Sequence, residues 1–401
     1  MIFRRTLDIR KGEFSGALRY AFGKKDSRDR LAKWEAETAK YIGVKHALAV
    51  SSGRHSLELI LTSLNLKRGD EIIVSAYTLR ELIPIIQRLG LMVIFADIDR
   101  TSFNMDPADV KRKITAKTKV ILVTHMFGNP CRIDELMRLA KAHNLYMIED
   151  CAHSIGSEIN GKKTGSFGEA AFFSFESMKM VNTYGGGLIT TDSSAIDQKI
   201  RKRISAYETS RLPLLKKVFV AFFEDRFING LFGKTFLTLL SYPKMKNALV
   251  SSYRIVQGHP TSKSRYSAFQ AGIGLKKLKD LDSRIARRRK AAELIRSTLH
   301  KQVAFQKTES AAKTNYYFFT GTVRCDTQKL RRRALRRGID IGILDELTHD
   351  CASFMGKRNF PNTRYVFSHS IQLPLDENIS LEQIRMITDV LRSEIPMHVR
   401  S

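Results

Sequence analysis

Cysteine is scarce in this sequence, and long apolar runs are missing from it. The 401 residues include four cysteines, and no two of them form a C-x-x-C pair. This spacing argues against a zinc site or a disulfide framework and is typical of a protein in a reducing cytoplasm. No apolar stretch reaches the roughly 18 residues needed to span a bilayer, and the N-terminal residues lack the apolar run of a signal peptide. We therefore expect a cytoplasmic protein, long enough to form two subdomains.

Acidic residues are also in short supply. Asp and Glu total 40 against 68 Lys and Arg, which leaves a formal net charge of +28. Such an excess attracts nucleic acid, anionic lipid or phosphorylated substrates. Two basic runs, Arg284–Lys290 and Arg331–Arg337, fall in helix-like stretches, where charge runs usually form solvated faces. No zinc finger or RNP-like aromatic motif accompanies them, so the sequence predicts no specific recognition of nucleic acid.

Short β-branched runs alternate with helical patterns along the first half of the chain. This alternation indicates βαβ units and therefore an α/β fold with a mainly parallel central sheet. A long basic helix over 281–299 leads into a smaller C-terminal α+β subdomain. We place the large domain at residues 1–250 and the small domain at residues 251–401. Further strands are expected at 46–50, 71–74, 92–97, 119–124, 316–323 and 371–374, and further helices at 56–64, 107–114, 133–143, 327–337 and 381–395.

Three further strands are expected close together in one Gly-rich stretch, at 146–149, 170–175 and 187–191. Asp150 follows the first of them, and Lys179 comes just past the end of the second. An acid and a lysine presented by adjacent strand ends are what a pyridoxal 5'-phosphate (PLP) site requires. The lysine amine binds the cofactor aldehyde covalently, and the carboxylate keeps the pyridine nitrogen protonated. A surface lysine and a strand-end aspartate are the plain alternative for each residue alone.

This stretch resembles the DegT/DnrJ/EryC1/StrS aminotransferases. The likeness rests on the segment Ile148-Glu149-Asp150-Cys151-Ala152-His153 and on Ser174-Phe175-Glu176-Ser177-Met178-Lys179, which matches an S-F-x-x-x-K motif. Weaker matches run from about Trp34 to the C-terminus. The resemblance implies a type I PLP-dependent (aspartate aminotransferase-like) fold and a homodimer with shared active sites. It also implies that the enzyme moves an amino group from glutamate or glutamine to a keto-sugar, usually on a nucleotide carrier.

The resemblance assigns further cofactor-binding residues. Ser174 matches a phosphate-binding Ser, and His153 stands where family members carry Gln or His near the 3-oxygen of the cofactor. The turn at Gly53 is expected to hold the cofactor phosphate, with Arg54 in place of the usual Thr. Lys263 replaces an Asn that reaches the phosphate from the neighbouring subunit, and a lysine can also hold phosphate.

The sequence departs from the family pattern at two places near the site. Leu79 stands where the family has an aromatic ring on the pyridine, so it would pack there without π-stacking, and Tyr77 is a possible substitute. The family's Gly-Glu-Gly-Gly is Tyr184-Gly185-Gly186-Gly187 here, and the acid is therefore missing. His125 follows another strand end, where a structural role and a site role are both open.

Residues 211–242 form a Phe-rich insert. Its charged residues interrupt the apolar ones too often for a transmembrane helix. Two interpretations remain open: a helical hairpin buried against the body or a second subunit, or an interfacial segment on a membrane. The net charge of +28 favours anionic lipid, so peripheral contact with an anionic membrane is predicted.

The function predicted from these residues is PLP-dependent amino transfer to a keto-sugar, with Lys179 and Asp150 as the catalytic pair. One alternative keeps the fold and the cofactor but places the enzyme at a membrane, acting on a lipid-linked or non-sugar ketone. Another is a non-catalytic regulatory or binding protein of the same fold. Retention of Lys179 and Asp150 disfavours that alternative, because a binding module needs neither residue.

Overall fold

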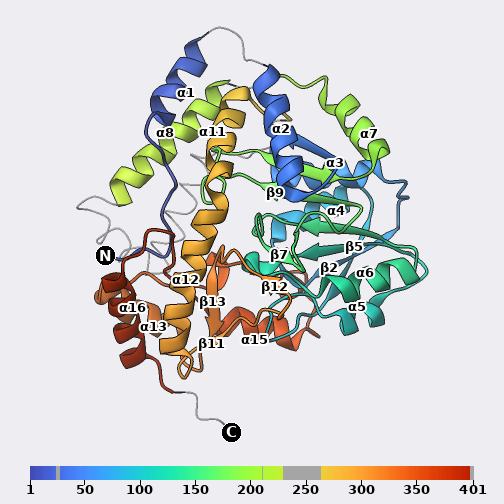
Figure 1. Cartoon of the computed structure of the whole chain (residues 1–401). Helices are drawn as coiled ribbons and strands as arrows, with labels where there is room; N and C mark the ends of the chain where they lie inside the picture. The colour runs from blue at the N-terminus through green and yellow to red at the C-terminus, as the bar shows by residue number, and fades with distance from the viewer. Residues whose placement is uncertain (24–27, 210, 229–262, 398–401) are drawn as a thin grey trace.

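The structure is a computed structural model that describes residues 1–23, 28–209, 211–228 and 263–397 (Figure 1). A large seven-stranded sheet organises the first half of the chain. Its strands are β1 (His46–Val50), β2 (Glu71–Ser75), β4 (Met92–Ala96), β5 (Thr118–Thr124), β6 (Tyr146–Asp150), β9 (Ala170–Ser174) and β10 (Gly187–Thr191). Each lies within about two residues of the span expected from its apolar run, as boundaries read from patterns usually do.

The strand order is β1-β10-β9-β6-β5-β2-β4. Every neighbouring pair is parallel except the two that involve β10. Successive residues of β5 enter different cores, since Val120 and Leu122 pack in one cluster and Ile121 and Val123 in another. Both faces of the sheet are therefore covered, which explains its nearly continuous apolar strands. The prediction of an α/β fold with a mainly parallel sheet is confirmed.

Helices from the same half of the chain cover this sheet. They are α2 (Arg28–Ile42), α3 (Gly53–Ser63), α4 (Ile83–Arg88), α5 (Pro107–Lys113), α6 (Ile133–Ala142) and α7 (Ser194–Ile204), with α11 (Ala268–Lys279) added from later in the sequence. Minor elements complete this part: β3 (Tyr77–Thr78), β7 (Glu158–Ile159), β8 (Lys162–Lys163), β12 (Ala312–Lys313) and the 3-10 turns η1 (Arg80–Leu82) and η2 (Met126–Gly128).

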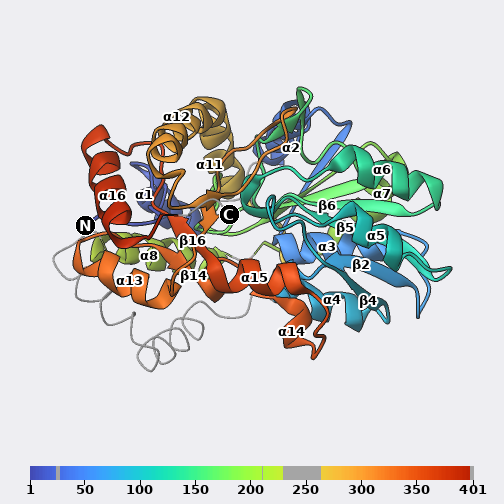
Figure 2. The same ribbon diagram turned by 90° about the horizontal axis from the view of Figure 1, so that it is seen from below.

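A second, four-stranded antiparallel sheet forms the C-terminal part and lies on the other side of the molecule in Figure 2. Its strands are β11 (Ala304–Phe305), β13 (Phe319–Thr322), β14 (Gly342–Ile343) and β16 (Ser370–Leu373). Its core also takes side chains from α12 (Leu281–Leu299), α13 (Thr327–Arg336) and α16 (Leu381–Glu394). This is the α+β arrangement predicted for the C-terminal subdomain. The predicted boundary at residue 250 lies outside the described residues and stays a prediction.

Some C-terminal elements return to the large sheet. The short strand β15 (His349–Asp350) pairs with β3, and α14 (Cys351–Phe354) places Cys351 and Ala352 in the core of the large sheet. They are followed by α15 (Pro361–His369), and the turn η3 (Leu344–Glu346) precedes β15. These contacts join the two sheets into one body.

The N-terminal arm runs back over the small sheet of its own chain. The Ile2 N–H donates to the Gly338 carbonyl at 2.8 Å, and Ile2 bridges Ile339 in parallel. The arm then leads into α1 (Glu13–Phe22), which lies beside α8 (Arg211–Ile228) in Figure 1. Position along the sequence gave no hint of this path, because the arm has no regular periodicity.

The Phe-rich insert begins as α8, one face of which is buried. Leu214 and Val218 enter a small core there, and the Phe222 ring stacks on Phe14 at 4.8 Å. Phe219 and Phe223 remain 48% and 53% exposed. Helix α8 therefore combines burial with an exposed aromatic edge, and the rest of the insert lies outside the described residues. Among the described helices, none has the length and apolar character to cross a membrane.

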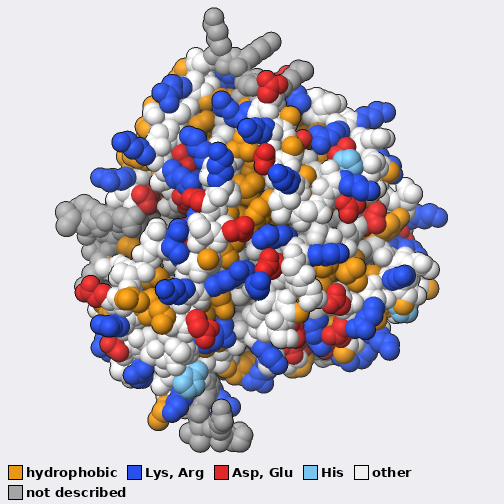
Figure 3. Space-filling view, in the orientation of Figure 1, with side chains coloured by type: hydrophobic (Ala, Val, Ile, Leu, Met, Phe, Trp, Pro, Cys, Tyr) orange, Lys and Arg blue, Asp and Glu red, His pale blue; other side chains and the backbone are white. Residues whose placement is uncertain are grey.

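The two basic runs differ from the expected solvated faces. Arg284 and Arg288 are buried and both pair with Glu377, at 2.7 and 3.2 Å. Arg331 is also buried and pairs with Glu346. The expectation is wrong for these three arginines, because acids distant in the sequence neutralise them. Figure 3 shows the remaining Lys and Arg side chains spread over the visible face among acidic ones, rather than gathered in one stripe.

Candidate active site

The predicted site residues meet at one edge of the large sheet. Strand β6 ends at Asp150, and its parallel neighbour β9 ends at Ser174. Strand β1 ends at Val50, and after a short turn helix α3 begins at Gly53. In an open α/β sheet, ligands bind beyond the carboxyl ends of the strands. The sheet thus brings the ends of these three strands to the edge where a ligand is expected.

Asp150 is a buried carboxylate that receives little hydrogen bonding in return for its lost contact with water. Its side chain accepts one hydrogen bond, from the Ala152 N–H at 3.0 Å, and the residue is 5% exposed. Burial raises the pKa of Asp150, while that hydrogen bond and the positive charge of Lys179 oppose the rise. A carboxylate in this position favours a cationic or N–H-bearing partner.

Lys179 comes five residues beyond the end of β9 and is partly buried. Its backbone N–H donates to the Glu176 carbonyl at 2.9 Å, which closes the turn that carries the side chain. The Lys179 amine lies 4.8 Å from the centre of the Tyr317 ring. Because its charge also acts on Asp150, the predicted acid and lysine share one electrostatic environment.

His153 lies in the same environment. Its ring stacks on Tyr317, with centroids 4.3 Å apart and planes 18° from parallel. Burial lowers the pKa of His153 well below its usual value, and the nearby charges of Lys179 and Arg5 lower it further. Among the described residues, nothing hydrogen-bonds to its buried Nδ1 atom. A neutral imidazole with a spare buried nitrogen is suited to bind a polar ligand atom.

The predicted phosphate turn has the geometry of an anion cradle. Ser52 caps α3 by accepting the His55 N–H at 3.1 Å, so that the first N–H groups of the helix face outward. A Cβ atom on Gly53 would lie 3.1 Å from the Cβ of Ser174. The close approach of this turn to Ser174 therefore favours glycine. Arg54, which follows it, is partly buried.

Two predicted residues lie further out in the single chain. Leu79 is 41% exposed, while Tyr77 is buried with its ring edge-on to Phe127 at 6.0 Å. The Lys263 amine lies 3.2 Å from a Glu58 carboxylate oxygen on α3, with most of its side chain in solvent. The assigned roles of Leu79 and Lys263 at the cofactor stay predictions.

Gly185 stands where the family has a glutamate, and the carboxylate of Glu176 lies near it. Gly185 adopts a φ of +119°, and a Cβ atom there would lie 2.8 Å from the Lys217 amine. That amine reaches from α8 and pairs with Glu176 at 3.1 Å. Glu176 precedes Lys179 by three residues, so the insert contacts the lysine-bearing turn directly.

A sequence profile of the DegT/DnrJ/EryC1/StrS aminotransferase family matches residues 21–392. The chain belongs to this family. The resemblance noted in the sequence is thereby confirmed over nearly the whole chain.

Individual relatives agree with this assignment. The chain is 40% identical to GDP-perosamine synthase of Vibrio cholerae over 169 residues, which are 42% of this chain and 46% of that protein. The matched part thus spans under half the length of this curated relative. The fold is similar to an aminotransferase from Psychrobacter cryohalolentis, with a TM-score of 0.76, 21% identity and coverage of 96% and 97%. An E. coli GDP-4-keto-6-deoxy-D-mannose-3-dehydratase with bound hydrated PLP gives a TM-score of 0.76 at 24% identity, with coverage of 98% and 99%.

The residues of this family member fit PLP. Lys179 offers an amine, and Asp150 offers a buried carboxylate with spare hydrogen-bonding capacity. His153 offers an unpartnered ring nitrogen, and the Gly53 turn offers helix N–H groups beside Ser174. An aldehyde, a pyridine nitrogen, a ring oxygen and a phosphate need this donor set.

Sequence reasoning missed Arg5 and Tyr317 as site residues. Tyr317 was expected inside a strand at 316–323, but β13 begins only at Phe319. Tyr316 has a φ of +50°, which breaks the extended pattern and lets the Tyr317 ring turn toward Lys179. The only signal was the run of aromatic residues at 316–319. Arg5 had no signal beyond its charge.

His125, Glu149 and Cys151 form a buried group whose ligand atoms lie within 4.8 Å of one another. Hydrogen bonds within the protein already account for it. Glu149 accepts one from His125 at 3.0 Å and three more from backbone N–H groups in the turn 165–168. His125 Nδ1 accepts the Cys131 N–H at 3.2 Å. These contacts give His125 a structural role, in which it holds Glu149 and the Cys131 backbone.

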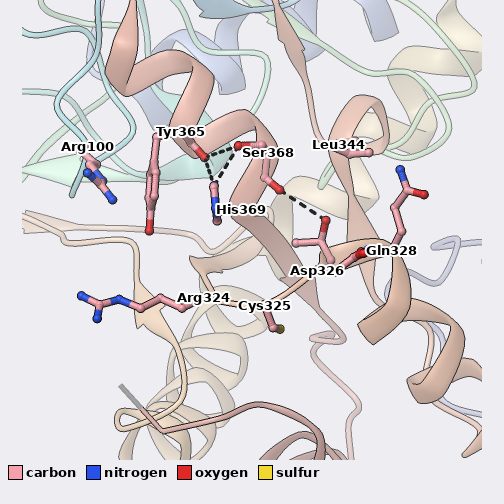
Figure 4. Close-up of a pocket in the computed structure, with 10 residues that line it drawn as sticks. Arg100, Arg324, Cys325, Asp326, Gln328, Leu344, Tyr365, Ser368 and His369 are labelled. Carbon is pink, nitrogen blue, oxygen red and sulfur yellow. Dashed lines mark hydrogen bonds between the residues drawn. The ribbon is translucent and has the colours of Figure 1, made fainter. Parts of the chain in front are cut away.

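A separate cavity of about 810 Å³ is lined mainly by residues of the C-terminal part of the chain, with Arg100 from the first half (Figure 4). The Arg100 guanidinium lies 3.1 Å from the centre of the Tyr365 ring, and Arg324 extends toward the same side. The Tyr365 ring stacks in turn on His369, with centroids 4.2 Å apart. None of the predicted site residues lines this cavity, so it is distinct from the Asp150–Lys179 site.

Proposed function

We propose that this family member is a PLP-dependent aminotransferase that moves an amino group from glutamate or glutamine to a keto-sugar. The observation that carries the proposal is that Lys179 and the buried acid Asp150 follow neighbouring parallel strands, and that the charge of Lys179 acts on Asp150. Membership of the aminotransferase family supports it. The name of the 40% identical relative, a GDP-perosamine synthase, supports a nucleotide-linked sugar as the acceptor.

Each residue has a defined task in this proposal. Lys179 holds the cofactor aldehyde, Asp150 holds the proton of the pyridine nitrogen, and His153 bonds the ring oxygen. When bound, PLP supplies an electron sink for negative charge on the α-carbon of the amino donor. The Lys179 amine, free once the donor amine has taken its place, would take the proton from the α-carbon of the donor. In the second half of the reaction it would deliver a proton to the acceptor carbon that gains the amino group. Ser174 and the Gly53 turn bind the phosphate, with Arg54 beside them.

We further propose a homodimer with shared sites. Lys263 of one protomer would contact the cofactor phosphate of the other, and Leu79 would pack on the pyridine ring. The support is that both residues are exposed in the single chain and lie near the elements that carry the site. In the dimer, Lys263 would exchange its contact with Glu58 for the phosphate.

Peripheral contact with an anionic membrane is a further proposal about where the enzyme works. The exposed rings Phe219 and Phe223 and the net charge of +28 support it. The four cysteines are all free, which supports a reducing cytoplasm. An enzyme of this kind would act at the cytoplasmic face of the membrane, for glycan or cell-envelope synthesis.

The experiment that tests the proposed function is a substrate screen with purified protein. The protein should take up PLP and absorb in the visible, and glutamate or glutamine should remove that band. Adding nucleotide-linked keto-sugars should restore the band and yield an amino sugar, detected by mass spectrometry. Loss of the band with donor but no product from any sugar would contradict the keto-sugar assignment.

A further inference from the structure

Arg5 lies on the aromatic rings of the candidate site. Its guanidinium carbon is 4.1 Å from the centre of the Phe318 ring and 4.6 Å from that of Tyr317. One of its N–H groups donates to the Met178 carbonyl at 3.3 Å, immediately before Lys179. The Lys179 amine lies 4.8 Å from the same Tyr317 centroid. Arg5 and Lys179 thus face one ring, although they are far apart in the sequence.

The two cations line a common cavity of about 190 Å³. Arg284 and Arg288 also line it, but both are paired with Glu377, and Arg284 also reaches Asp8 at 3.1 Å. Arg5 differs from them. In the described part of the chain, no carboxylate lies within ion-pair distance of its guanidinium. Lys179 is the other cation of this cavity, and in the described part of the chain neither Lys179 nor Arg5 has an acid within ion-pair distance.

An unmatched, partly buried guanidinium is costly unless a ligand compensates it. Burial lowers the pKa of Arg5, the neighbouring Tyr317 opposes part of this change, and the nearby Arg4 and Arg288 lower the pKa further. The stacked rings fix the plane of the guanidinium. A guanidinium fixed in this way presents a fork of N–H groups that matches a carboxylate or a phosphate.

We propose that Arg5 binds an oxyanion group of a substrate held at Lys179. The group is the carboxylate of the amino donor or a phosphate of the nucleotide-linked acceptor, which share the chemistry that a guanidinium recognises. This inference rests on the proposed function, because it requires a substrate at Lys179. It adds that the N-terminal arm, through Arg5, sets the specificity of the site.

The test compares the wild type with Arg5→Gln, Arg5→Lys and the control Arg19→Gln. Arg19 is an exposed residue of α1, and its loss changes the net charge equally. The probes are glutarate, a dicarboxylate without an amine, and guanosine diphosphate, both measured by titration calorimetry. Uptake of PLP, read from absorbance, should be equal in all four proteins, because Arg5 is not assigned to the cofactor.

If Arg5 binds the donor carboxylate, Arg5→Gln should weaken the binding of glutarate about 10-fold to 100-fold. It should also raise the KM for glutamate more than it lowers kcat. If Arg5 binds the acceptor phosphate, Arg5→Gln should weaken the binding of guanosine diphosphate by a similar factor and leave the binding of glutarate unchanged. Arg5→Lys, which keeps the charge but not the fork, should be intermediate.

Equal affinities for both probes in Arg5→Gln and Arg19→Gln would overturn the inference. If Arg5→Gln does not fold, Arg5→Lys takes its place, and equal affinities for both probes in Arg5→Lys and Arg19→Gln would overturn the inference. A wild-type protein that takes up no PLP would contradict the proposed function instead. The two failures are therefore distinguishable, because probe binding is measured independently of cofactor uptake.

Discussion

The His125 imidazole and the Glu149 carboxylate lie 3.0 Å apart, and both side chains are completely buried. The backbone N–H of His125 donates to the backbone carbonyl of Asp150 at 3.2 Å, so the residue that carries the imidazole is tied to the backbone from which Asp150 projects. The pKa of Glu149 is lowered, because the bond from His125 and backbone N–H groups outweigh burial.

We expect Glu149→Gln to destabilise the protein by about 1 to 3 kcal/mol, since it removes a buried carboxylate that accepts four hydrogen bonds, three of them from backbone N–H groups. Chemical denaturation at pH 6 measures this change. As a control, Glu135→Gln removes an acid whose pair with Arg132 is partly exposed, and it should cost under about 1 kcal/mol. Equal, small losses for both variants would contradict a supporting role for the pair.

The pair should also make stability depend on pH. Glu149 has a lowered pKa, so its contribution is present above about pH 4.3 and is lost as the pH falls through the folded pKa. The difference in stability between wild type and Glu149→Gln should therefore be larger above about pH 4.3 than below it.

Asp150→Asn should separate stability from activity. The pKa of Asp150 is raised by burial, so its ionised form costs stability above about pH 3.9 and the neutral amide removes that cost. The cofactor-free variant should unfold at the same or a higher temperature than the wild type at pH 7. Turnover should fall on the order of 100-fold or more, because an amide cannot hold the pyridinium proton. Near-native turnover would mean that Asp150 is not the pyridine partner.

Shared sites predict complementation between two inactive variants. Lys179→Ala and Lys263→Ala protomers, mixed after partial unfolding and refolding together, should form heterodimers with one intact site each. Activity should then exceed that of either parent, up to about a quarter of wild type for random mixing of the two. No recovery in dimers shown to be mixed would contradict the contribution of Lys263 across the interface.

Membrane association is tested most cleanly at the exposed rings of α8. Phe222 packs on Phe14, so its replacement would disturb the fold, whereas Phe219 and Phe223 are about half exposed. Phe219→Asp/Phe223→Asp should reduce cosedimentation with anionic liposomes, and zwitterionic liposomes should pellet little wild-type protein. Negligible pelleting of the wild type in both cases would favour burial of the insert.

The strands of the large sheet could be predicted because local patterns encode them. The run at 146–149 ends beside an acid, and β6 indeed ends at Asp150. The buried arginines of α12 could not be predicted, because Arg284 and Arg288 look like a solvated run until Glu377 is brought to them from the C-terminal part. Such pairs depend on tertiary structure, which a charge pattern does not record.

The candidate site was predictable to the same degree. Asp150, Lys179, Ser174 and Gly53 follow strand ends or turns that a sequence reveals, and the parallel sheet brings these ends to one edge. Arg5 was not predictable, because it reaches the site through an irregular arm held by the small sheet.

The central claim is that Lys179 is the residue that holds PLP. Protein loaded with PLP should be reduced with borohydride, digested and analysed by mass spectrometry, with Lys179→Ala and Lys217→Ala treated in parallel. Lys217 is the matched control, because its amine lies beside Gly185, near the same turn. The account predicts a pyridoxyl label on the peptide that contains Lys179, retained in Lys217→Ala and absent from Lys179→Ala. A label on any other lysine of the wild type would contradict it.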